Sequence, residues 1–441
     1  MPRYVAPLFQ HCDLCLIIFA HRRGIAEQNL ETLPHPSRTR RRVQLKYDFD
    51  RIIDRRGTNS SKWDLNKTMF GTEDVLDMWV ADMDFECPEP VLRAIRERLE
   101  HPILGYTFPP QSLYEAIVDR MERFYGWKIQ KEWIVFNSGV VNGLFSAVDA
   151  FCRPGDELIL QPPVYYPFYR TSKNLGVVPL ENRLKFDGKR YTMDFDALEK
   201  MFEAHTTFPV HLPRIKMLVL CSPHNPVGRV WTKEELKTLS EICLKNDCIV
   251  VSDEIHCDLM LYGSRHTVTS TLSEEIQHNT ITLMAASKTF NLAGLGTSFA
   301  VIPDPEKRKA YALVRGGHSS GNLFGHIALE AAFEHGDEYL SQLCEYLTGN
   351  MEYFCSYIEK NIPKLKIVRP EGTYLAWLDM RELGLSNKEL QHFVRFKARL
   401  ALDDGYAFGP GGDGFQRVNL ACPRSTVEEA LARLEAAVNS L

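Results

Sequence analysis

The 441-residue sequence lacks several features that would assign it to a special class of protein. It has no apolar run long enough to span a bilayer, no internal repeat and no low-complexity tract. Its net charge of −5 provides no basic excess that would indicate nucleic acid or an anionic membrane as a partner. The eleven cysteines are odd in number and scattered, which argues against a disulfide framework and favours a reducing compartment. We therefore expect a cytoplasmic protein that binds neither nucleic acid nor membranes.

Residues 1–45 differ in composition from the rest of the chain, with seven arginines and only three acidic residues. The apolar run at 14–20 is too short for a membrane span and lacks a convincing small-residue cleavage site. Cys12 and Cys15 form one Cys-x-x-Cys pair without a second pair, so we expect no metal site rather than a zinc or redox site. We expect a disordered extension here, with an organelle transit peptide as the alternative.

The remaining chain has the composition of a soluble globular protein and is long enough for a large core and a smaller domain. From residue 133 onward, apolar runs of strand length alternate with helical patterns, which predicts an α/β fold with a mostly parallel sheet. The predicted strands of this sheet lie at 133–136, 157–160, 177–180, 217–221, 248–252, 280–283 and 298–302.

Both ends of this region have predicted elements of their own. Upstream we expect a strand at 78–85 that ends in acidic residues, a helix after residue 90 and a helix at 112–125. The clearest helix within the sheet region is predicted at 233–245, and two long helical stretches are expected between 334 and 361. Downstream we expect strands at 365–368, 374–378 and 416–420 and a final helix from 426. This layout predicts a large domain at 91–335 and a small α+β domain built from 46–90 and 336–441.

Two predicted strands end in charged residues. The apolar run at 281–286 is followed by Ser287 and Lys288, and the run at 248–252 is followed by Asp253. Lysine is rare at the end of a buried strand unless its amine is needed there. Such a lysine and aspartate suit a pyridoxal 5'-phosphate (PLP) site, in which the lysine forms the Schiff base and the aspartate pairs with the pyridinium nitrogen. For either residue alone, a surface lysine or a helix-capping aspartate is the alternative.

Three other turns follow predicted strands. Gly139 and Val140 open a helix, whose free N–H groups suit a phosphate. Tyr165 can stack on a flat ring, and Asn225, in an Asn-Pro-x-Gly turn, can present its amide to a phenolate oxygen. Each turn has an ordinary structural explanation when taken alone. Ligands of α/β sheets bind at the carboxyl ends of the strands, so the combination with the lysine and the aspartate favours one shared cofactor site.

From about residue 46 to the C-terminus, the chain resembles the fold-type I PLP enzymes of the class I/II aminotransferase superfamily. Four motifs are similar to the MalY/PatB branch of carbon–sulfur β-lyases: Trp-Val-Ala-Asp-Met-Asp-Phe at 79–85, Asp-Glu-Ile-His at 253–256, Ser-Lys-Thr-Phe-Asn at 287–291 and Glu-Gly-Thr-Tyr-Leu-Ala-Trp at 371–377. The resemblance implies PLP as cofactor, an amino acid as the small-molecule substrate, and a homodimer.

The resemblance also implies roles for individual residues. The implied catalytic residues are Lys288, as Schiff-base lysine and base, and Asp253, as partner of the ring nitrogen. The other implied cofactor contacts are Asn225, Tyr165, Gly139, Val140, His256, Ser287 and Tyr106, the last reaching the phosphate from the neighbouring subunit. The implied substrate-binding residues are Arg417, for the α-carboxylate, and Ala81.

Two positions depart from the pattern of the family. Ala285 replaces a hydroxyl residue, and Gly296 stands where aminotransferases have a phosphate-binding arginine. Binding of the phosphate should therefore depend more on backbone N–H groups, Ser287 and Tyr106.

The activity implied by the resemblance is carbon–sulfur β-lysis of cystathionine or related cysteine S-conjugates to a thiol, pyruvate and ammonia. A class I/II aminotransferase is the alternative, because the same residues support both reactions. A regulatory binding protein on the same fold is a third hypothesis. The intact set of Lys288, Asp253, Asn225 and Arg417 argues against a purely regulatory role.

Overall fold

A computed structural model describes residues 47–207, 214–315 and 320–441, which belong to one compact unit spanning Leu45–Leu441. The predicted N-terminal extension at 1–45 lies outside the described residues. In the part of the chain that the structure describes, no helix is both long and apolar enough to cross a membrane. The predicted division into a large and a small domain stays a prediction.

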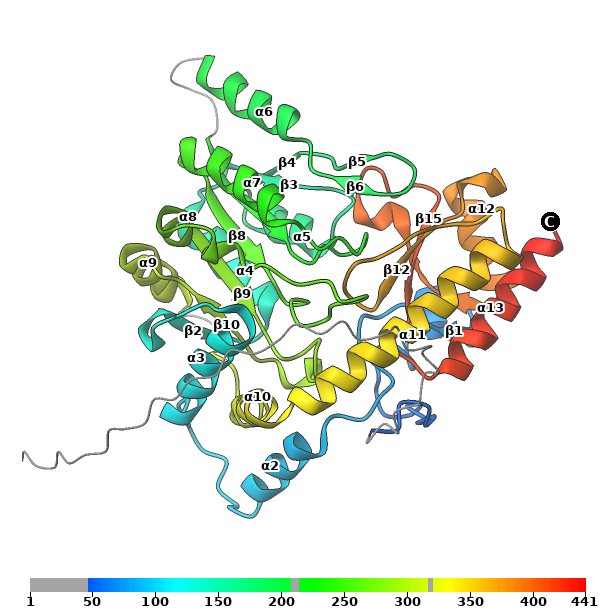
Figure 1. The fold of residues 1–441 in the computed structure, drawn as a ribbon, viewed down its shortest axis with the longest axis horizontal. Coiled ribbons are helices and arrows are strands. Elements are labelled where there is room, and N and C mark those ends of the chain that lie inside the picture. Colours follow the sequence, from blue (N-terminus) through cyan, green and yellow to red (C-terminus); the bar gives the residue numbers. More distant parts are fainter. Residues whose placement is uncertain (1–46, 208–213, 316–319) are drawn as a thin grey trace, which may run out of the picture. The chain divides into compact units, whose positions relative to one another are not determined.

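A seven-stranded sheet forms the centre of the molecule, in the order β2-β10-β9-β8-β7-β3-β4 (Figure 1). Its strands are β2 (Ile134–Asn137), β3 (Glu157–Leu160), β4 (Val178–Glu181), β7 (Ile215–Cys221), β8 (Ile249–Asp253), β9 (Thr280–Met284) and β10 (Ser298–Val301). Neighbours from β9 to β4 are parallel, whereas β10 is antiparallel to both β2 and β9. The predicted α/β class with a mostly parallel sheet is confirmed, and all seven strands lie within two residues of their predicted ends.

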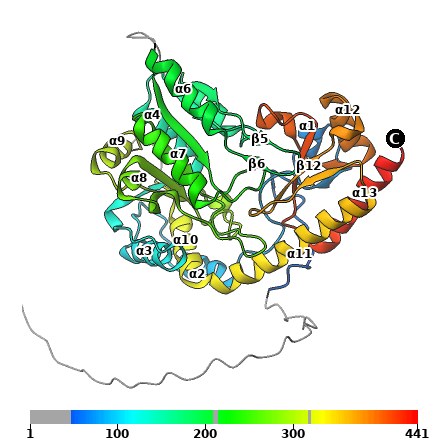
Figure 2. The same cartoon turned by 45° about the horizontal axis from the view of Figure 1, so that its top comes forward.

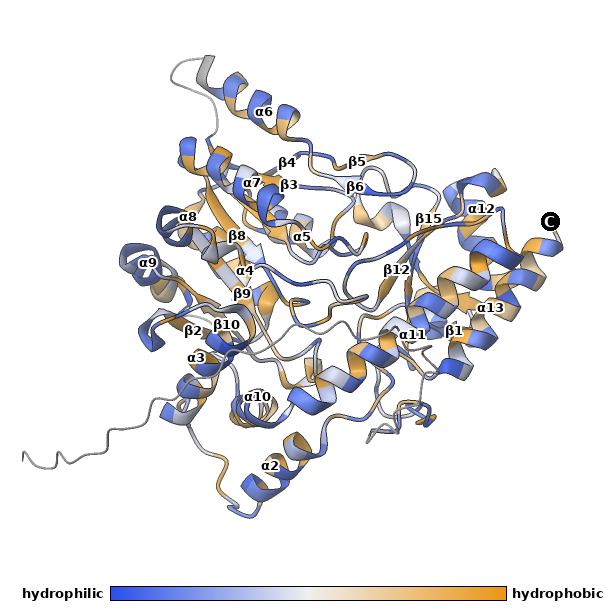
Figure 3. Ribbon diagram, viewed as in Figure 1, coloured by the Kyte–Doolittle hydropathy of each residue, from blue (hydrophilic) through white to orange (hydrophobic). Residues whose placement is uncertain are grey.

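Helices cover both faces of this sheet, because alternate residues of each central strand point to opposite sides. In β7, Met217, Val219 and Cys221 pack in one apolar cluster with residues of α4 (Val140–Phe151). Leu218 and Leu220 pack in another cluster with residues of α7 (Lys233–Lys245). Figure 3 shows the resulting hydrophobic strands between helices with hydrophilic outer faces. Because both faces of these strands are buried, each strand is visible in the sequence as a continuous apolar run.

A second sheet has four strands in the order β11-β12-β15-β14. Its strands are β11 (Lys366–Val368), β12 (Leu375–Asp379), β14 (Asp403–Asp404) and β15 (Phe415–Asn419). The three longer strands match the prediction to within one residue, whereas the two-residue β14 was not predicted. Helices α11 (Asp337–Asn361) and α13 (Arg424–Asn439) run side by side along this part of the molecule (Figure 2). The prediction of two helical stretches before residue 361 was wrong: buried residues recur through the whole of α11, so one helix continues over 25 residues.

The other described elements complete the fold. The predicted helices after residue 90 and at 112–125 are α2 and α3, and α7 has its predicted bounds. The remaining bounds are α1 (Asn66–Phe70), α2 (Glu89–Leu99), α3 (Gln111–Tyr125), α5 (Pro167–Asn174), β5 (Lys185–Phe186), β6 (Tyr191–Thr192), α6 (Phe195–Thr207), α8 (Glu274–Asn279), α9 (Pro305–Arg315), α10 (Leu323–His335) and α12 (Asn387–His392).

The predicted strand at 78–85 is absent from the structure. Only β1 (Leu76–Asp77) pairs, in parallel with β13 (Leu400–Ala401), and the chain then continues as an irregular segment. Side chains satisfy the carbonyl groups that a ladder would otherwise use: Asn419 and Asn291 each donate from Nδ2 to two backbone oxygens of this segment. The apolar pattern was interpreted as a strand because local spacing carries no information about such distant side-chain partners. Ala81 of this segment lines a cavity.

Candidate active site

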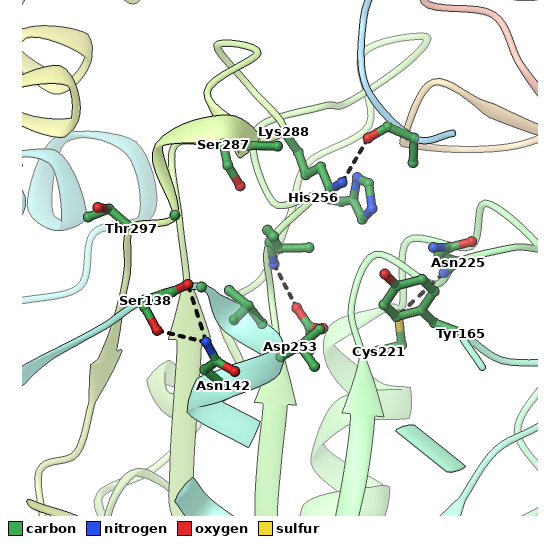
Figure 4. A pocket seen from close by; sticks show the side chains of 17 residues that line it. Ser138, Asn142, Tyr165, Cys221, Asn225, Asp253, His256, Ser287, Lys288 and Thr297 are labelled. Carbon is green, nitrogen blue, oxygen red and sulfur yellow. Dashed lines mark hydrogen bonds between the residues drawn. The ribbon is translucent and has the colours of Figure 1, made fainter. Parts of the chain in front are cut away.

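One cavity lies at the carboxyl ends of the central strands (Figure 4). Asp253 is the last residue of β8 and Cys221 the last of β7, while Lys288 follows β9 and Ser138 follows β2. The lining residues are Ala81, Ser138, Gly139, Val140, Val141, Asn142, Tyr165, Cys221, Asn225, Asp253, Ile255, His256, Ser287, Lys288, Ala293, Gly296 and Thr297. Nine of the predicted site residues are thus brought together around this cavity, and Tyr106 and Arg417 are not among the lining residues.

Asp253 is a buried carboxylate at the floor of the cavity. Its Oδ1 accepts a hydrogen bond from the backbone N–H of Ile255, at 3.1 Å. Burial raises the pKa of Asp253 to about 7, and the charge of Lys288 lowers it only in part. A cationic hydrogen-bond donor beside this carboxylate would lower its pKa again, because an opposite charge favours the ionised form. The protonated ring nitrogen of PLP is such a donor.

Lys288 presents its amine to the same cavity. Its Nζ donates to the carbonyl oxygen of Ala81 at 2.7 Å (Figure 4). Burial and the nearby charge of Arg417 lower the pKa of Lys288 to about 8. The next residue, Thr289, donates its hydroxyl to Asp258 at 2.8 Å, which anchors the backbone beside the lysine. The amine can therefore lose its proton near neutral pH and act as a nucleophile or a base.

The N-terminus of α4 forms the opposite end of the cavity. Gly139 has a φ of +128°, a conformation that favours glycine, and the first turn of this 12-residue helix contains no acidic residue. Its free N–H groups and its positive dipole end suit a phosphate. The hydroxyl residues Ser138, Ser287 and Thr297 line the same cavity. Asn142 donates to the Ser138 hydroxyl at 2.7 Å, which leaves that hydroxyl its own proton to donate.

Gly296 also lines the cavity, and a Cβ built on it would lie 3.6 Å from the carbonyl oxygen of Ser138. Among the described residues, none of those that line the cavity is an arginine. A phosphate at this end would therefore be held by N–H groups and hydroxyls of this chain rather than by a guanidinium group.

Asn225 and Arg417 meet at the edge of the cavity. Arg417 Nη1 donates to Asn225 Oδ1 at 3.0 Å, so the NH₂ group of the asparagine is the part left for a ligand. The turn that carries Asn225 is pressed against a distant loop. A Cβ on Gly228, which has a φ of +71°, would lie 2.2 Å from Pro370 Cβ, so only glycine fits there.

His256 and Tyr165 complete the wall around the ring position. His256 is buried and its Nδ1 has no hydrogen-bond partner among the described residues. Burial lowers the pKa of His256 well below its ordinary value, so the ring is neutral. Burial raises the pKa of Tyr165 to about 12, so its hydroxyl keeps its proton. The unpartnered, uncharged Nδ1 of His256 fits the oxygen substituent of a pyridine ring.

Two residues with predicted roles lie elsewhere. Tyr106 is fully exposed in the connection between α2 and α3. Arg417, on β15, is buried behind the lining residues and reaches the cavity edge through Asn225. Five residues in or near the site have no predicted role: Asn142, Thr297, Cys221, Tyr374 and Asp403. Tyr374 belongs to the quoted motif at 371–377, whereas Asp403 lies on a strand too short to be predicted.

A lysine, an aspartate and the N-terminus of a helix around one cavity of this sheet define the class: a PLP-dependent enzyme of fold type I. Residues 73–434 match the sequence profile of the family "Aminotransferase class I and II". The chain belongs to this family, and PLP is its cofactor.

Known proteins are similar to this chain over nearly all of its described length. Cystathionine beta-lyase PatB of Bacillus subtilis is 42% identical over 394 residues, which cover 89% of this chain and 100% of PatB. The PLP-bound putative aminotransferase of Clostridium difficile 630 has a TM-score of 0.85 and 41% identity, covering 89% of this chain and 100% of that one. Cystalysin of Treponema denticola, whose structure contains PLP, has a TM-score of 0.84 and 38% identity, covering 89% of this chain and 99% of that one. The expected resemblance to the PatB-type lyases is confirmed.

Proposed function

We propose that this protein is a PLP-dependent carbon–sulfur β-lyase that cleaves cystathionine or a related cysteine S-conjugate. The reaction consumes one water molecule and releases a thiol, pyruvate and ammonia. The observation that carries the proposal is the position of one amine of lowered pKa, Lys288, in the same cavity as Asp253. The full-length identity of 42% to a protein named as a cystathionine β-lyase favours lysis over other reactions of the family.

Three residues would bind the substrate and the cofactor, each through the chemistry of its own side chain. Arg417 binds the α-carboxylate of the amino acid through charge-assisted hydrogen bonds. Asp253 keeps the proton on the ring nitrogen, and the NH₂ group of Asn225 donates to the ring oxygen. When bound, PLP accepts the electron pair left at Cα, a capacity that amino-acid side chains lack.

Lys288 moves the proton. Its neutral amine removes the proton from Cα of the substrate, and the carbon–sulfur bond then breaks with both electrons leaving on sulfur. The ammonium group so formed returns a proton to the departing thiolate. The unsaturated amine that remains takes up water and yields pyruvate and ammonia.

We also infer the assembly from the family pattern. A homodimer would let the exposed Tyr106 of each subunit reach the phosphate in the other, which accounts for a tyrosine that has no place in its own cavity. The proposed large domain is 91–335 and the proposed small domain is 46–90 with 336–441.

Aminotransfer is the second candidate, because the family as a whole is named for it. Purified protein loaded with PLP should release thiol and pyruvate in equal amounts from cystathionine in the absence of any keto acid. Lys288→Ala, prepared in the same way, should release neither and serves as the control. Turnover that requires a keto acid acceptor and produces no thiol would replace the lyase with an aminotransferase.

A further inference from the structure

A buried carboxylate, Asp403, already binds Arg417, the arginine that in the proposed function holds the α-carboxylate of the substrate. Asp403 on β14 and Arg417 on β15 are directly paired in the antiparallel register. The Asp403 carboxylate accepts a hydrogen bond from Arg417 Nη2. Only 3% of the Arg417 side chain and 15% of the Asp403 side chain are exposed, so water screens this pair weakly.

The other contacts of Arg417 leave it little freedom. Its Nη2 also donates to the carbonyl oxygen of Trp79 at 2.9 Å, and Nη1 donates to Asn225 at 3.0 Å. The guanidinium carbon lies 5.0 Å from the centre of the Phe408 ring. Nε is buried without a hydrogen-bond partner among the described residues. Three of the five guanidinium donors are thus in use, including both on Nη2.

This occupancy has a direct consequence for a ligand. A carboxylate held by both terminal nitrogens of Arg417 must displace either the Trp79 carbonyl oxygen or Asp403 from Nη2. If the Trp79 oxygen is displaced, two carboxylates share one positive charge and repel each other; if Asp403 is displaced, its buried carboxylate loses its cationic partner while a second carboxylate lies nearby. Asp404, the neighbour of Asp403, contacts Arg395 and the side chains of Gln391 and Gln416 instead, and so offers a matched comparison.

We propose that Asp403 is a positioning residue that orients Arg417 and competes with the α-carboxylate of the substrate for it, which weakens carboxylate binding and speeds release of the carboxylate product. This inference rests on the proposed function only in taking Arg417 as the carboxylate site. Orientation and competition have opposite effects on affinity, and two substitutions separate them. Asn at position 403 keeps an oxygen acceptor for Nη2 but removes the charge, whereas Ala removes both.

The test measures binding to the PLP-loaded enzyme with 2-methylalanine, an amino acid that has no proton on Cα and therefore cannot undergo the proton abstraction that begins turnover. Asp403→Asn should lower its dissociation constant by at least about fivefold, because the charge repulsion at short range is removed. Asp403→Ala should raise the dissociation constant, because Arg417 loses its orientation. Asp404→Asn should leave it within about twofold of the wild-type value, as expected for a carboxylate with other partners.

Two control measurements test whether the effect of Asp403→Asn depends on the ligand carboxylate and on Arg417. The methyl ester of 2-methylalanine lacks the carboxylate, so Asp403→Asn should not tighten its binding. In an Arg417→Gln background, Asp403→Asn should no longer tighten binding of the free acid. Weaker or unchanged binding of 2-methylalanine to Asp403→Asn would overturn the inference, as would equal tightening for the ester. Absence of thiol release from cystathionine would overturn the proposed function alone and leave this binding result standing.

Discussion

The amine of Lys288 lies 2.7 Å from the carbonyl oxygen of Ala81, a residue 207 positions earlier in the chain. The same oxygen accepts a hydrogen bond from the buried hydroxyl of Tyr374, at 2.8 Å. The lysine that follows a strand of the central sheet is thus held by the irregular segment after β1. This contact keeps the amine inside the cavity, where burial and neighbouring charges set its pKa.

The lowered pKa of Lys288 predicts how the apoprotein takes up its cofactor. Only the neutral amine attacks the aldehyde, so the rate of covalent attachment should rise with pH up to about 8 and then level off. An ordinary lysine would continue to gain reactivity up to its usual pKa of 10.5. Stopped-flow absorbance of apoprotein mixed with PLP between pH 6 and 10 measures this curve.

Two substitutions should move the curve in opposite directions. Arg417 lowers the pKa of Lys288, so Arg417→Gln should shift the rise to higher pH. Asp82 raises that pKa, so Asp82→Asn should shift the rise to lower pH. Shifts of the same sign in both variants would contradict the electrostatic cause.

Asp253→Ala should retain cofactor but lose most activity, because it removes the carboxylate that we propose keeps the ring nitrogen protonated. We expect kcat to fall by far more than tenfold, and a tenfold fall alone already corresponds to about 1.4 kcal/mol of transition-state stabilisation. Steady-state thiol release, with bound PLP quantified by absorbance, measures both effects. A fall of less than about tenfold would remove Asp253 from this role. Asp253→Asn is a weaker test, since an amide can still form a hydrogen bond to the nitrogen.

The exposed Tyr106 predicts complementation between two defective subunits. In a mixed dimer of Lys288→Ala and Tyr106→Phe subunits, a tyrosine that crosses the interface puts both defects in one site and leaves the other site intact. Activity should recover toward one wild-type site per dimer, after correction for the parent homodimers. No recovery in a verified mixed dimer would place the action of Tyr106 in its own subunit. A fully active monomer would contradict the homodimer itself.

A buried ion pair behind the lysine should matter for stability. Arg120 and Asp258 lie 2.9 Å apart between Nη2 and Oδ1, with 1% and 3% of their side chains exposed. Asp258→Ala leaves the buried Arg120 with only the half-exposed Asp337 as an ionic partner and removes the acceptor of the Tyr125 and Thr289 hydroxyls, so it should lower the free energy of unfolding by about 3–5 kcal/mol. Asp258→Leu combined with Arg120→Met should be less destabilising than Asp258→Ala, because the buried positive charge is removed together with its buried partner. Guanidinium chloride unfolding curves of the apoproteins give this comparison.

The sequence by itself determined the strands of the central sheet and the order of the residues at their ends. Strands buried on both faces must be apolar throughout, so their bounds are visible as continuous runs. Lys288, Asp253, Asn225 and Gly139 lie at most four residues beyond the ends of these strands. The carboxyl ends of parallel strands share one edge of the sheet, so local patterns were sufficient to bring these residues to one site.

Only the tertiary structure decided the features that depend on contacts between distant segments. The segment at 78–85 has the apolar pattern of a strand, but the side chains of Asn419 and Asn291 donate to four of its carbonyl oxygens, and its Ala81 lines the cavity. Asp403 belongs to a two-residue strand that no periodicity reveals, and its pairing with Arg417 exists only because β14 lies beside β15. Hydrogen bonds and charge pairs of this kind join positions that are far apart in the chain, and the residues near either partner carry no pattern that identifies the other.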